Sequence, residues 1–379
     1  MGMDGYLGWP LAMHLSGRGH TVSGVDNFSR RRNVEELGSQ SATPIKPIED
    51  RLEAYQRATG RKLRFHEGDL TNTEFTDKVI KLERPDCVVH LGEIPSAPYS
   101  MIDVEHCNYT QTNNLIGTNN ILFAMKKHVP HCHLVKLGTM GEYGTPNIDI
   151  PEGFFEIEYR GRKDVLPFPR QPGSWYHLSK VHDSHNIMFA CKVWGLRSTD
   201  IMQGVVHGVV TDEMVSDDLL TRFDFDEAWG TALNRFCAQA VIGHELTPYG
   251  KGGQTRGYIA LRDSVECMTI TAENPAKEGE YRVFNQFDET YSVNELAEHV
   301  TRVAGEFGID AKIWSVKNPR VEKEEHYYNP DRDKLPALGF NPSHDVDAEL
   351  RLTIPKLMKY RERIEEKKDA IRLNIRWQQ

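Results

Sequence analysis

The sequence predicts an α/β protein with a doubly wound parallel sheet and a smaller C-terminal α/β lobe. Short apolar runs that fit buried strands alternate with longer helical patterns through residues 1–202, and a doubly wound sheet requires this alternation. The rhythm fades afterwards, so we expect residues 203–379 to form mainly the second lobe, with segments that return to the first. A length of 379 residues also exceeds what a single core usually organises.

The composition is that of a soluble globular protein, with 39% hydrophobic and 27% charged residues. No apolar run approaches the roughly 18 residues that a membrane-spanning helix needs, and a net charge of −9 disfavours general nucleic-acid binding. The six cysteines are scattered without a C-x-x-C pair. We therefore expect no disulfide framework, no metal site and a reducing compartment, and we expect the cytoplasm because no signal segment is recognisable.

The chain opens with glycines at positions 2, 5 and 8, which are followed by a helical pattern to Gly17. Glycines at this spacing allow a tight turn and the close approach of a pyrophosphate to a helix N-terminus. The pattern therefore predicts a dinucleotide loop. Such a loop normally follows a strand, yet only Met1 precedes Gly2, so we expect the first strand of the sheet to be missing from this chain.

Residues 21–26 read as a strand that ends in Asp26, 18 residues after Gly8. A carboxylate at this distance commonly binds the adenosine ribose of a dinucleotide. It repels a 2′-phosphate, which favours NAD over NADP, although Arg30, Arg31 and Arg32 weaken this preference. A glycine turn followed by a chance acid is the alternative reading.

Further elements continue the alternation as far as residue 137. We expect, in order, a helix at 48–58 inside a polar insertion, a strand at 62–66, a helix at 73–82, a strand at 87–92, a helix at 104–127 and a strand at 133–137. Asp69, at a strand's carboxyl end, is well placed to meet adenine. Asn114, in the middle of its helix, either holds neighbouring backbone or is solvated.

Tyr176 and Lys180 lie four residues apart, so on a helix they share one face. A lysine ammonium beside a phenol favours the phenolate, and such a tyrosine can remove a hydroxyl proton while hydride leaves the same carbon. Thr139, after the strand at 133–137, either bonds the same substrate oxygen or caps the strand end. Alone, the Tyr-x-x-x-Lys spacing also fits an ordinary exposed helix.

Residues 145–172 are rich in proline, glycine and charged residues, and we expect this loop to act as a lid.

The second half of the chain carries separated cations in turn-rich segments. Thr231 and Arg235 open a helix, Lys251 and Arg256 lie in a glycine-rich turn, and Arg320 follows later. In a net acidic chain such cations suit a diphosphate, although each alone is more often a surface charge. The tail at 345–374 reads as a charged amphipathic helix with a packing role only.

Taken together, these motifs resemble the extended short-chain dehydrogenase/reductase family, from Gly2 to about Tyr328. The stretches that carry the resemblance are 96–103, 135–144, 176–185 and 249–258. The resemblance implies a Rossmann-like fold that binds NAD, a second lobe that binds a UDP-sugar, and a homodimer through the helices at 104–127 and 175–194. Sugar 4,6-dehydratases of this family carry Asp-Glu directly after the threonine, where this chain has Met140 and Gly141.

Within the family the chain is most similar to sulfosugar-nucleotide synthases, which implies that UDP-glucose and sulfite, or a sulfite donor, give UDP-sulfoquinovose and water. By this resemblance Tyr176, steadied by Lys180, takes the O4 proton during C4 oxidation. The C6 hydroxyl is then lost, sulfite adds at C6, and C4 is reduced again. Glu142 and His177 are both candidates for proton transfer at C5 and C6. The alternatives are a UDP-hexose 4-epimerase and a non-catalytic NAD-binding sensor or partner protein.

The residues and the resemblance together assign a set of positions to each ligand. The cofactor positions are Gly2, Gly5, Tyr6, Leu7, Gly8, Asp26, Asn27, Arg30, Asp69, Leu70, Leu91, Gly92, Glu93, Asn114, Tyr176, Lys180, Gln203 and Val206. The substrate positions are Ser96, Tyr99, Thr139, Met140, Gln203, Thr231, Arg235, Lys251, Gln254, Arg256 and Arg320.

Overall fold

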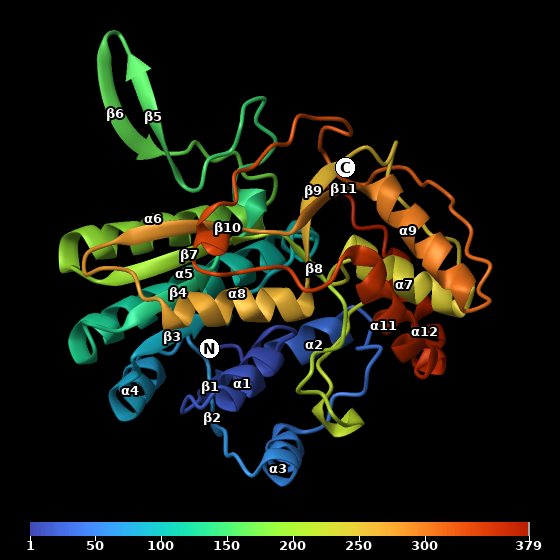
Figure 1. Ribbon diagram of the computed structural model, residues 1–379, viewed down its shortest axis with the longest axis horizontal. Coiled ribbons are helices and arrows are strands. Elements are labelled where there is room, and N and C mark those ends of the chain that lie inside the picture. Colours follow the sequence, from blue (N-terminus) through green and yellow to red (C-terminus); the bar gives the residue numbers. More distant parts are fainter. Residues whose placement is uncertain (378–379) are drawn as a thin grey trace.

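A parallel sheet forms the centre of the first lobe in the computed structural model, which describes residues 1–377 (Figure 1). The strands are β1 (Ser23–Asp26), β2 (Arg64–Glu67), β3 (Cys87–His90), β4 (His133–Leu137), β5 (Phe154–Tyr159), β6 (Arg162–Pro167), β7 (Arg197–Gln203), β8 (Val205–His207), β9 (Thr255–Ala260), β10 (Tyr281–Gln286) and β11 (Glu289–Ser292). Four of them pair in parallel in the order β10-β7-β4-β3, and β1 pairs in parallel with β2. The predicted fold class is confirmed, and β10 is a segment of the second half that returns to this sheet.

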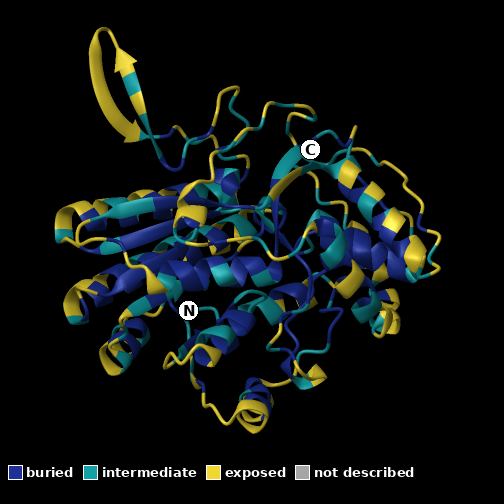
Figure 2. Ribbon diagram, in the orientation of Figure 1, coloured by how far each residue is buried: buried dark blue, intermediate teal, exposed yellow. Residues whose placement is uncertain are grey.

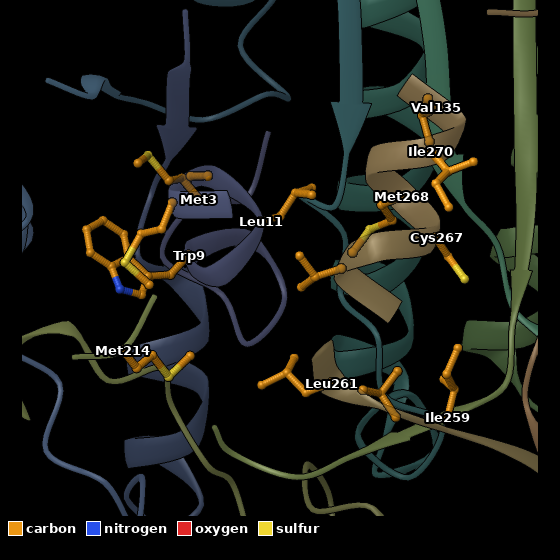
Figure 3. Close-up of a cluster of buried hydrophobic side chains, with 14 of the residues drawn as sticks. Met3, Trp9, Leu11, Val135, Met214, Ile259, Leu261, Cys267, Met268 and Ile270 are labelled. Atoms are coloured by element: carbon orange, nitrogen blue, oxygen red, sulfur yellow. The ribbon is translucent and has the colours of Figure 1, made fainter. Parts of the chain in front are cut away.

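Helices cover both faces of the sheet. They are α1 (Gly8–Gly17), α2 (Ser29–Glu36), α3 (Ile48–Thr59), α4 (Thr73–Glu83), α5 (Val104–His128), α6 (Trp175–Trp194), α7 (Ala232–Ile242), α8 (Leu261–Glu273), α9 (Val293–Glu306), α10 (Lys334–Ala337), α11 (Val346–Met358) and α12 (Arg361–Glu366). Leu134 of β4 packs into a cluster with α4, α5 and α6, whereas Val135 packs into the cluster of α1 and α8 (Figure 3). The strand is thus buried on both sides, which explains its continuous apolar run. None of the described helices is long and apolar enough to cross a membrane.

Met1 alone lies between β1 and β3. Its amino group donates a hydrogen bond to the Val89 carbonyl at 2.8 Å, and its own carbonyl accepts one from the Leu91 amide at 3.0 Å. The next amide, that of Gly2, donates to the Val25 carbonyl at 2.7 Å. Met1 and Gly2 together therefore join the two groups of strands, and within residues 1–377 the glycine loop begins directly after Met1.

The second lobe combines a small sheet, in the order β11-β9-β8, with helices α7, α9, α11 and α12 (Figure 1). Its core contains Leu233, Phe236, Val300 and Leu350. The single helix predicted for the tail is wrong. The tail divides into α11, α12 and a 3₁₀ turn at Lys368–Arg372, and then continues without regular structure to residue 377.

The predicted loop at 145–172 contains a β-hairpin of β5 and β6, which projects from the body of the protein (Figure 1). Most of its surface is exposed (Figure 2). Arg160 and Gly161 connect the strands and both have positive φ, +53° and +75°, as two-residue hairpin turns require. Sequence reasoning also missed α2, whereas the other predicted helices and strands of the first lobe lie within a few residues of their expected positions.

The polar insertion is packed against the glycine loop. Asp4 of this loop forms ion pairs with Arg31 of α2 at 2.6 Å and with Arg51 of α3 at 2.8 Å. The Arg51 guanidinium is fully buried, lies 4.0 Å from the centre of the Trp9 ring and donates to the Leu220 carbonyl. Helix α3 thus fixes the loop through a buried charge pair.

Replacement of Arg51 by alanine should lower the free energy of unfolding by about 3 kcal/mol, because it leaves part of the buried Asp4 charge uncompensated. Arg57→Ala is the matched control on the same helix, since its ion pair with Glu53 is largely exposed and should contribute less than about 1 kcal/mol. Urea denaturation of both variants measures the difference. Equal losses would contradict a structural role for the buried pair.

Candidate active site

One cavity of about 920 Å³ lies at the carboxyl ends of β1, β3, β4 and β7 and extends into the second lobe. Ligands of doubly wound proteins bind at this edge of the sheet. Most of the predicted site residues line it. They are Gly2, Gly5, Tyr6, Leu7, Gly8, Asp26, Asn27, Arg30, Leu70, Leu91, Gly92, Glu93, Ser96, Thr139, Met140, Tyr176, His177, Lys180, Gln203, Val206, Thr231, Arg235, Gln254, Arg256 and Arg320.

The glycine loop has no room for side chains at two of its positions. Gly2 has a φ of +81°, and a Cβ atom on Gly8 would lie 1.9 Å from the Gly2 carbonyl oxygen. Asp26, at the end of β1, accepts backbone hydrogen bonds from Asp4 and Phe28, both at 2.8 Å. The loop can therefore present its backbone to a ligand beside a fixed acidic side chain.

The neighbouring arginines are already engaged. Arg30 pairs with Asp224 at 3.0 Å and its guanidinium lies 3.9 Å from the centre of the Trp229 ring. Arg31 pairs with Asp4. The charges of Arg30 and Arg31 are therefore compensated by protein carboxylates. The carboxylate of Asp26 lines the cavity beside the glycine loop.

Tyr176 and Lys180 both lie on α6 and line the cavity, but Lys180 does not activate the phenol as predicted. Its ammonium group forms an ion pair with Glu93 and donates to the Leu137 carbonyl. Burial raises the pKa of Tyr176, and the negative charges of Glu93 and Glu142 raise it further. The predicted lowering of this pKa by Lys180 is thus wrong for the ligand-free site, because Glu93 compensates the lysine charge.

A second carboxyl group, that of Asp183, lies beside Glu93. Burial raises the pKa of Asp183 well above its usual value, and the Glu93 charge adds to this effect. Neither Asp183 oxygen, nor Oε1 of Glu93, has another hydrogen-bond partner among the described residues. The Lys180 ammonium group therefore lies next to Glu93, and burial together with the Glu93 charge favours the neutral form of Asp183.

The sequence left two roles open for each of Thr139 and Asn114, and their hydrogen bonds bear on these roles. The Thr139 hydroxyl caps the turn after β4 by accepting from the Gly141 amide at 3.1 Å, and it also lies close enough to oppose the rise in the Tyr176 pKa by hydrogen bonding. Asn114 accepts from the Ile94 amide at 2.7 Å and donates to Ser179 at 2.9 Å. The Thr139 hydroxyl therefore acts as a cap, and its bond to the substrate oxygen stays a prediction, whereas Asn114 holds backbone and lies outside the cavity lining.

Four further predicted residues also lie outside the cavity lining. Asp69 accepts from Thr71 and Asn27, and Tyr99 is buried and donates to Glu36 at 2.9 Å. Lys251 is exposed on its turn. Local partners take up two of these side chains and the third points to solvent, so none of the three lines the cavity and their contacts with a ligand stay predictions.

Glu142 is the fourth. It is fully buried, pairs with Lys136 at 3.3 Å, forms a second ion pair with Arg170 and accepts from Ser184 at 3.1 Å. A carboxylate held by two cations away from the cavity is a poor donor or acceptor of substrate protons. Its position is that of an anchor for the segment that follows the hairpin.

His177 lines the cavity beside Gly141, and its Nδ1 shares a hydrogen bond with Ser174 at 3.0 Å. Burial lowers the pKa of His177 to about 3, and the positive charges of Arg320 and Arg256 contribute. The imidazole is therefore neutral at pH 7. It combines a free acceptor position with two nearby cations.

Arg235 brings a buried positive charge to the same cavity. Its guanidinium donates to the Tyr249 hydroxyl at 3.1 Å, and its Nε atom has no partner among the described residues. Arg256 is balanced by Glu322 at 3.1 Å. The second lobe thus offers an anion a desolvated guanidinium.

Sequence reasoning missed several residues of the lining. The aromatic ones are Trp229, Tyr249, Tyr258, Tyr328 and Trp377, of which Tyr249 and Tyr258 had been noticed as the ends of a turn-rich segment. Trp229 lies shortly before the helix that contains Arg235, so its place in the sequence could have identified it as a site residue. Trp377 ends an alternation of apolar and polar residues from Ile371 onward, which indicates an extended segment rather than the predicted helix.

Comparison with known proteins agrees with this geometry. A Spinacia oleracea protein named "UDP-sulfoquinovose synthase, chloroplastic" is 54% identical over 97% of this chain and 76% of its own length. The "UDP-sulfoquinovose synthase" of Sulfolobus acidocaldarius is 48% identical over 100% of this chain and 96% of its own length. The crystal structure of a UDP-glucose 4-epimerase with UDP-glucose from Thermotoga maritima has a TM-score of 0.71 at 21% identity, over 94% of this chain and 97% of that chain, which supports the fold.

Residues 1–285 match the model of the NAD dependent epimerase/dehydratase family. The matched residues include the first lobe and part of the second. The predicted family is confirmed by this match and by the two relatives. This chain belongs to the NAD dependent epimerase/dehydratase family.

Proposed function

We propose that this protein catalyses the reaction of a UDP-sulfoquinovose synthase, in which UDP-glucose and sulfite give UDP-sulfoquinovose and water. The observation that carries the proposal is one cavity that combines Tyr176, Thr139 and His177 with the buried cation Arg235. Two relatives with this name support it, because they match 97% and 100% of the chain at 54% and 48% identity.

The first lobe fits NAD by its own features. The glycine loop leaves room only for backbone at Gly8, and Asp26 faces the place of an adenosine ribose. The pairing of Arg30 and Arg31 with carboxylates disfavours a 2′-phosphate. Bound NAD⁺ supplies a hydride acceptor for the sugar C4 and a positive charge near the phenol of Tyr176.

Tyr176 accepts the O4 proton in this proposal, and Thr139 hydrogen-bonds the same oxygen. The phenol is poorly acidic in the ligand-free site because of burial and Glu93. An added positive charge or a shift of Lys180 away from Glu93 lowers its pKa. Tyr176 therefore becomes an effective base only when the cofactor is bound, which limits the chemistry to the loaded site.

We assign the C5 proton to His177 rather than to Glu142. His177 lines the cavity and is neutral, whereas Glu142 lies outside it between Lys136 and Arg170. The 4-ketone makes C5–H acidic, and removal of this proton expels the C6 hydroxyl as water. Sulfite then adds to C6 of the resulting C5–C6 double bond, and a proton returns to C5. The hydride taken from C4 would then return from the cofactor and a proton to O4, which restores the C4 hydroxyl and NAD⁺. A substrate diphosphate that neutralises Arg320 and Arg256 raises the pKa of His177 toward the useful range.

Incubation with UDP-glucose and isotopically labelled sulfite should give a sulfonated UDP-sugar that carries the label. Tyr176→Phe should lower its rate by about 10²- to 10⁴-fold, because the base is lost, while Tyr159→Phe on the exposed hairpin should leave it unchanged. Mass analysis of the nucleotide sugar measures both. Formation of UDP-galactose without a sulfonated product would support the epimerase alternative. The absence of any new nucleotide sugar, with no difference between the wild type and Tyr176→Phe, would support a non-catalytic protein.

His177→Ala should separate the two halves of the reaction. Oxidation of C4, followed as absorbance at 340 nm in a single turnover, should persist, whereas the sulfonated product should fall by about 10²-fold or more. His182→Ala, an exposed histidine of the same helix, is the control and should retain both. Full product formation by the His177 variant would assign the C5 proton to another group.

We also propose a homodimer through α5 and α6. These helices pack side by side and expose large apolar side chains along their outer surface. They are Val104, Tyr109, Ile116 and Phe123 of α5 and Trp175, Phe189 and Val193 of α6. A two-fold interface that buries this face on both subunits removes the exposed apolar surface.

Phe189→Asp should shift the protein from dimer to monomer in sedimentation velocity, because it places a charge in the apolar interface. Val215→Asp is the control, since Val215 is 71% exposed but lies outside these helices. A wild-type protein that sediments as a monomer at micromolar concentration would refute the interface.

A further inference from the structure

We propose that Trp377 is a positioning residue of the substrate site, which holds the Arg320 guanidinium toward the diphosphate of a bound nucleotide. The inference rests on the proposed function for the identity of the nucleotide. It concerns a residue that follows the tail predicted at 345–374 and to which the sequence pattern assigned no role.

The segment after Arg372 has no regular structure, and its residues alternate in exposure. Leu373, Ile375 and Trp377 are half-buried, whereas Arg372, Asn374 and Arg376 are exposed. Asn374 has a φ of +59°, a conformation that asparagine tolerates better than most residues. The three apolar side chains of this segment are therefore the ones that lie against the protein body.

Contacts of Asn374, Ile375 and Trp377 hold this segment in place. The Asn374 amide donates to Glu227 at 2.6 Å, and Ile375 packs against the cluster that contains Ile94 and Trp229. The Trp377 amide donates to the Pro319 carbonyl at 3.2 Å. The chain therefore passes from Glu227 and the cluster of Ile94 and Trp229 to the turn that carries Arg320. The indole of Trp377 lines the cavity.

The Arg320 guanidinium lies between two aromatic rings. Its central carbon is 5.5 Å from the centre of the Trp377 ring and 5.8 Å from that of Tyr249. Arg235 lies 4.6 Å from the same Tyr249 ring. The result is a row of alternating aromatic and cationic groups, which come from four segments distant in the sequence.

This arrangement selects an anion with more than one charged oxygen. Neither Arg320 nor Arg235 forms an ion pair with a carboxylate of residues 1–377, so both charges are open to a ligand. A planar guanidinium whose faces lie toward rings keeps its edge N–H groups for phosphate oxygens. Trp377 thus sets the orientation of Arg320 without itself contacting the phosphates.

Calorimetry with the NAD-loaded full chain tests the inference, with UDP and uridine as probes. Trp377→Ala should weaken UDP binding about 3- to 30-fold, the range of a cation–π contact, and should change uridine binding much less. Trp377→Phe, which keeps an aromatic face, should restore most of the affinity. Trp314→Ala is the matched control, because Trp314 is 63% exposed and does not line the cavity.

A double-mutant cycle shows whether Trp377 acts through Arg320. In an Arg320→Ala background, the change of Trp377 to alanine should have no further effect on UDP affinity. Additive losses, or equal losses for UDP and uridine, would overturn the positioning role and make Trp377 a wall of the base site or a purely structural residue. Because these readouts are binding constants, a failure to form sulfonated product would refute the proposed reaction without deciding this inference.

Discussion

The parallel direction of β1, β3, β4 and β7 decides where the reactive side chains of this protein meet. Strands that run in one direction end at one edge, so the segments that follow them converge there. Asp26, Glu93, Thr139 and Gln203 end or follow these strands and all line the same cavity. The glycine loop is held at this edge because Met1 bonds to Val89 and Leu91 while Gly2 bonds to Val25 of β1.

Some charged side chains of this cavity are paired with one another in the absence of a ligand, and others are not. Glu93 compensates the charge of Lys180, and burial together with the charges of Glu93 and Glu142 raises the pKa of Tyr176. Arg256 is balanced by Glu322, while Arg235 is left without a carboxylate partner among the described residues. The site therefore favours a ligand that brings positive charge to the Tyr176 side and negative charge to the Arg235 side, which agrees with NAD⁺ and a nucleotide diphosphate.

Buried ion pairs attach the irregular segments to this frame. Arg51 ties the polar insertion to Asp4 of the glycine loop, and Arg170 ties the segment after the β5–β6 hairpin to Glu142. Such pairs add little net stability compared with apolar contacts, but breaking one leaves a buried charge. Their directional geometry explains how segments with few apolar side chains still take defined positions around the cavity.

Much of the fold could be read from local patterns. The strand at 133–137 and the helices around α3, α4 and α5 were predicted within a few residues, because buried strands and amphipathic helices have periods that neighbouring residues alone reveal. The hairpin was missed because a turn of Arg160 and Gly161 carries a weaker signal than the usual Asn-Gly.

The sequence by itself determined the sheet, the glycine loop and the spacing of Tyr176 and Lys180, since each depends on residues close together in the chain. Only the tertiary structure decided that Lys180 pairs with Glu93, that Glu142 is an anchor and that Trp377 reaches Arg320. The partners in these contacts are separated by 87, 28 and 57 residues respectively. Electrostatic balance and stacking depend on distance in space, which one sequence does not encode locally.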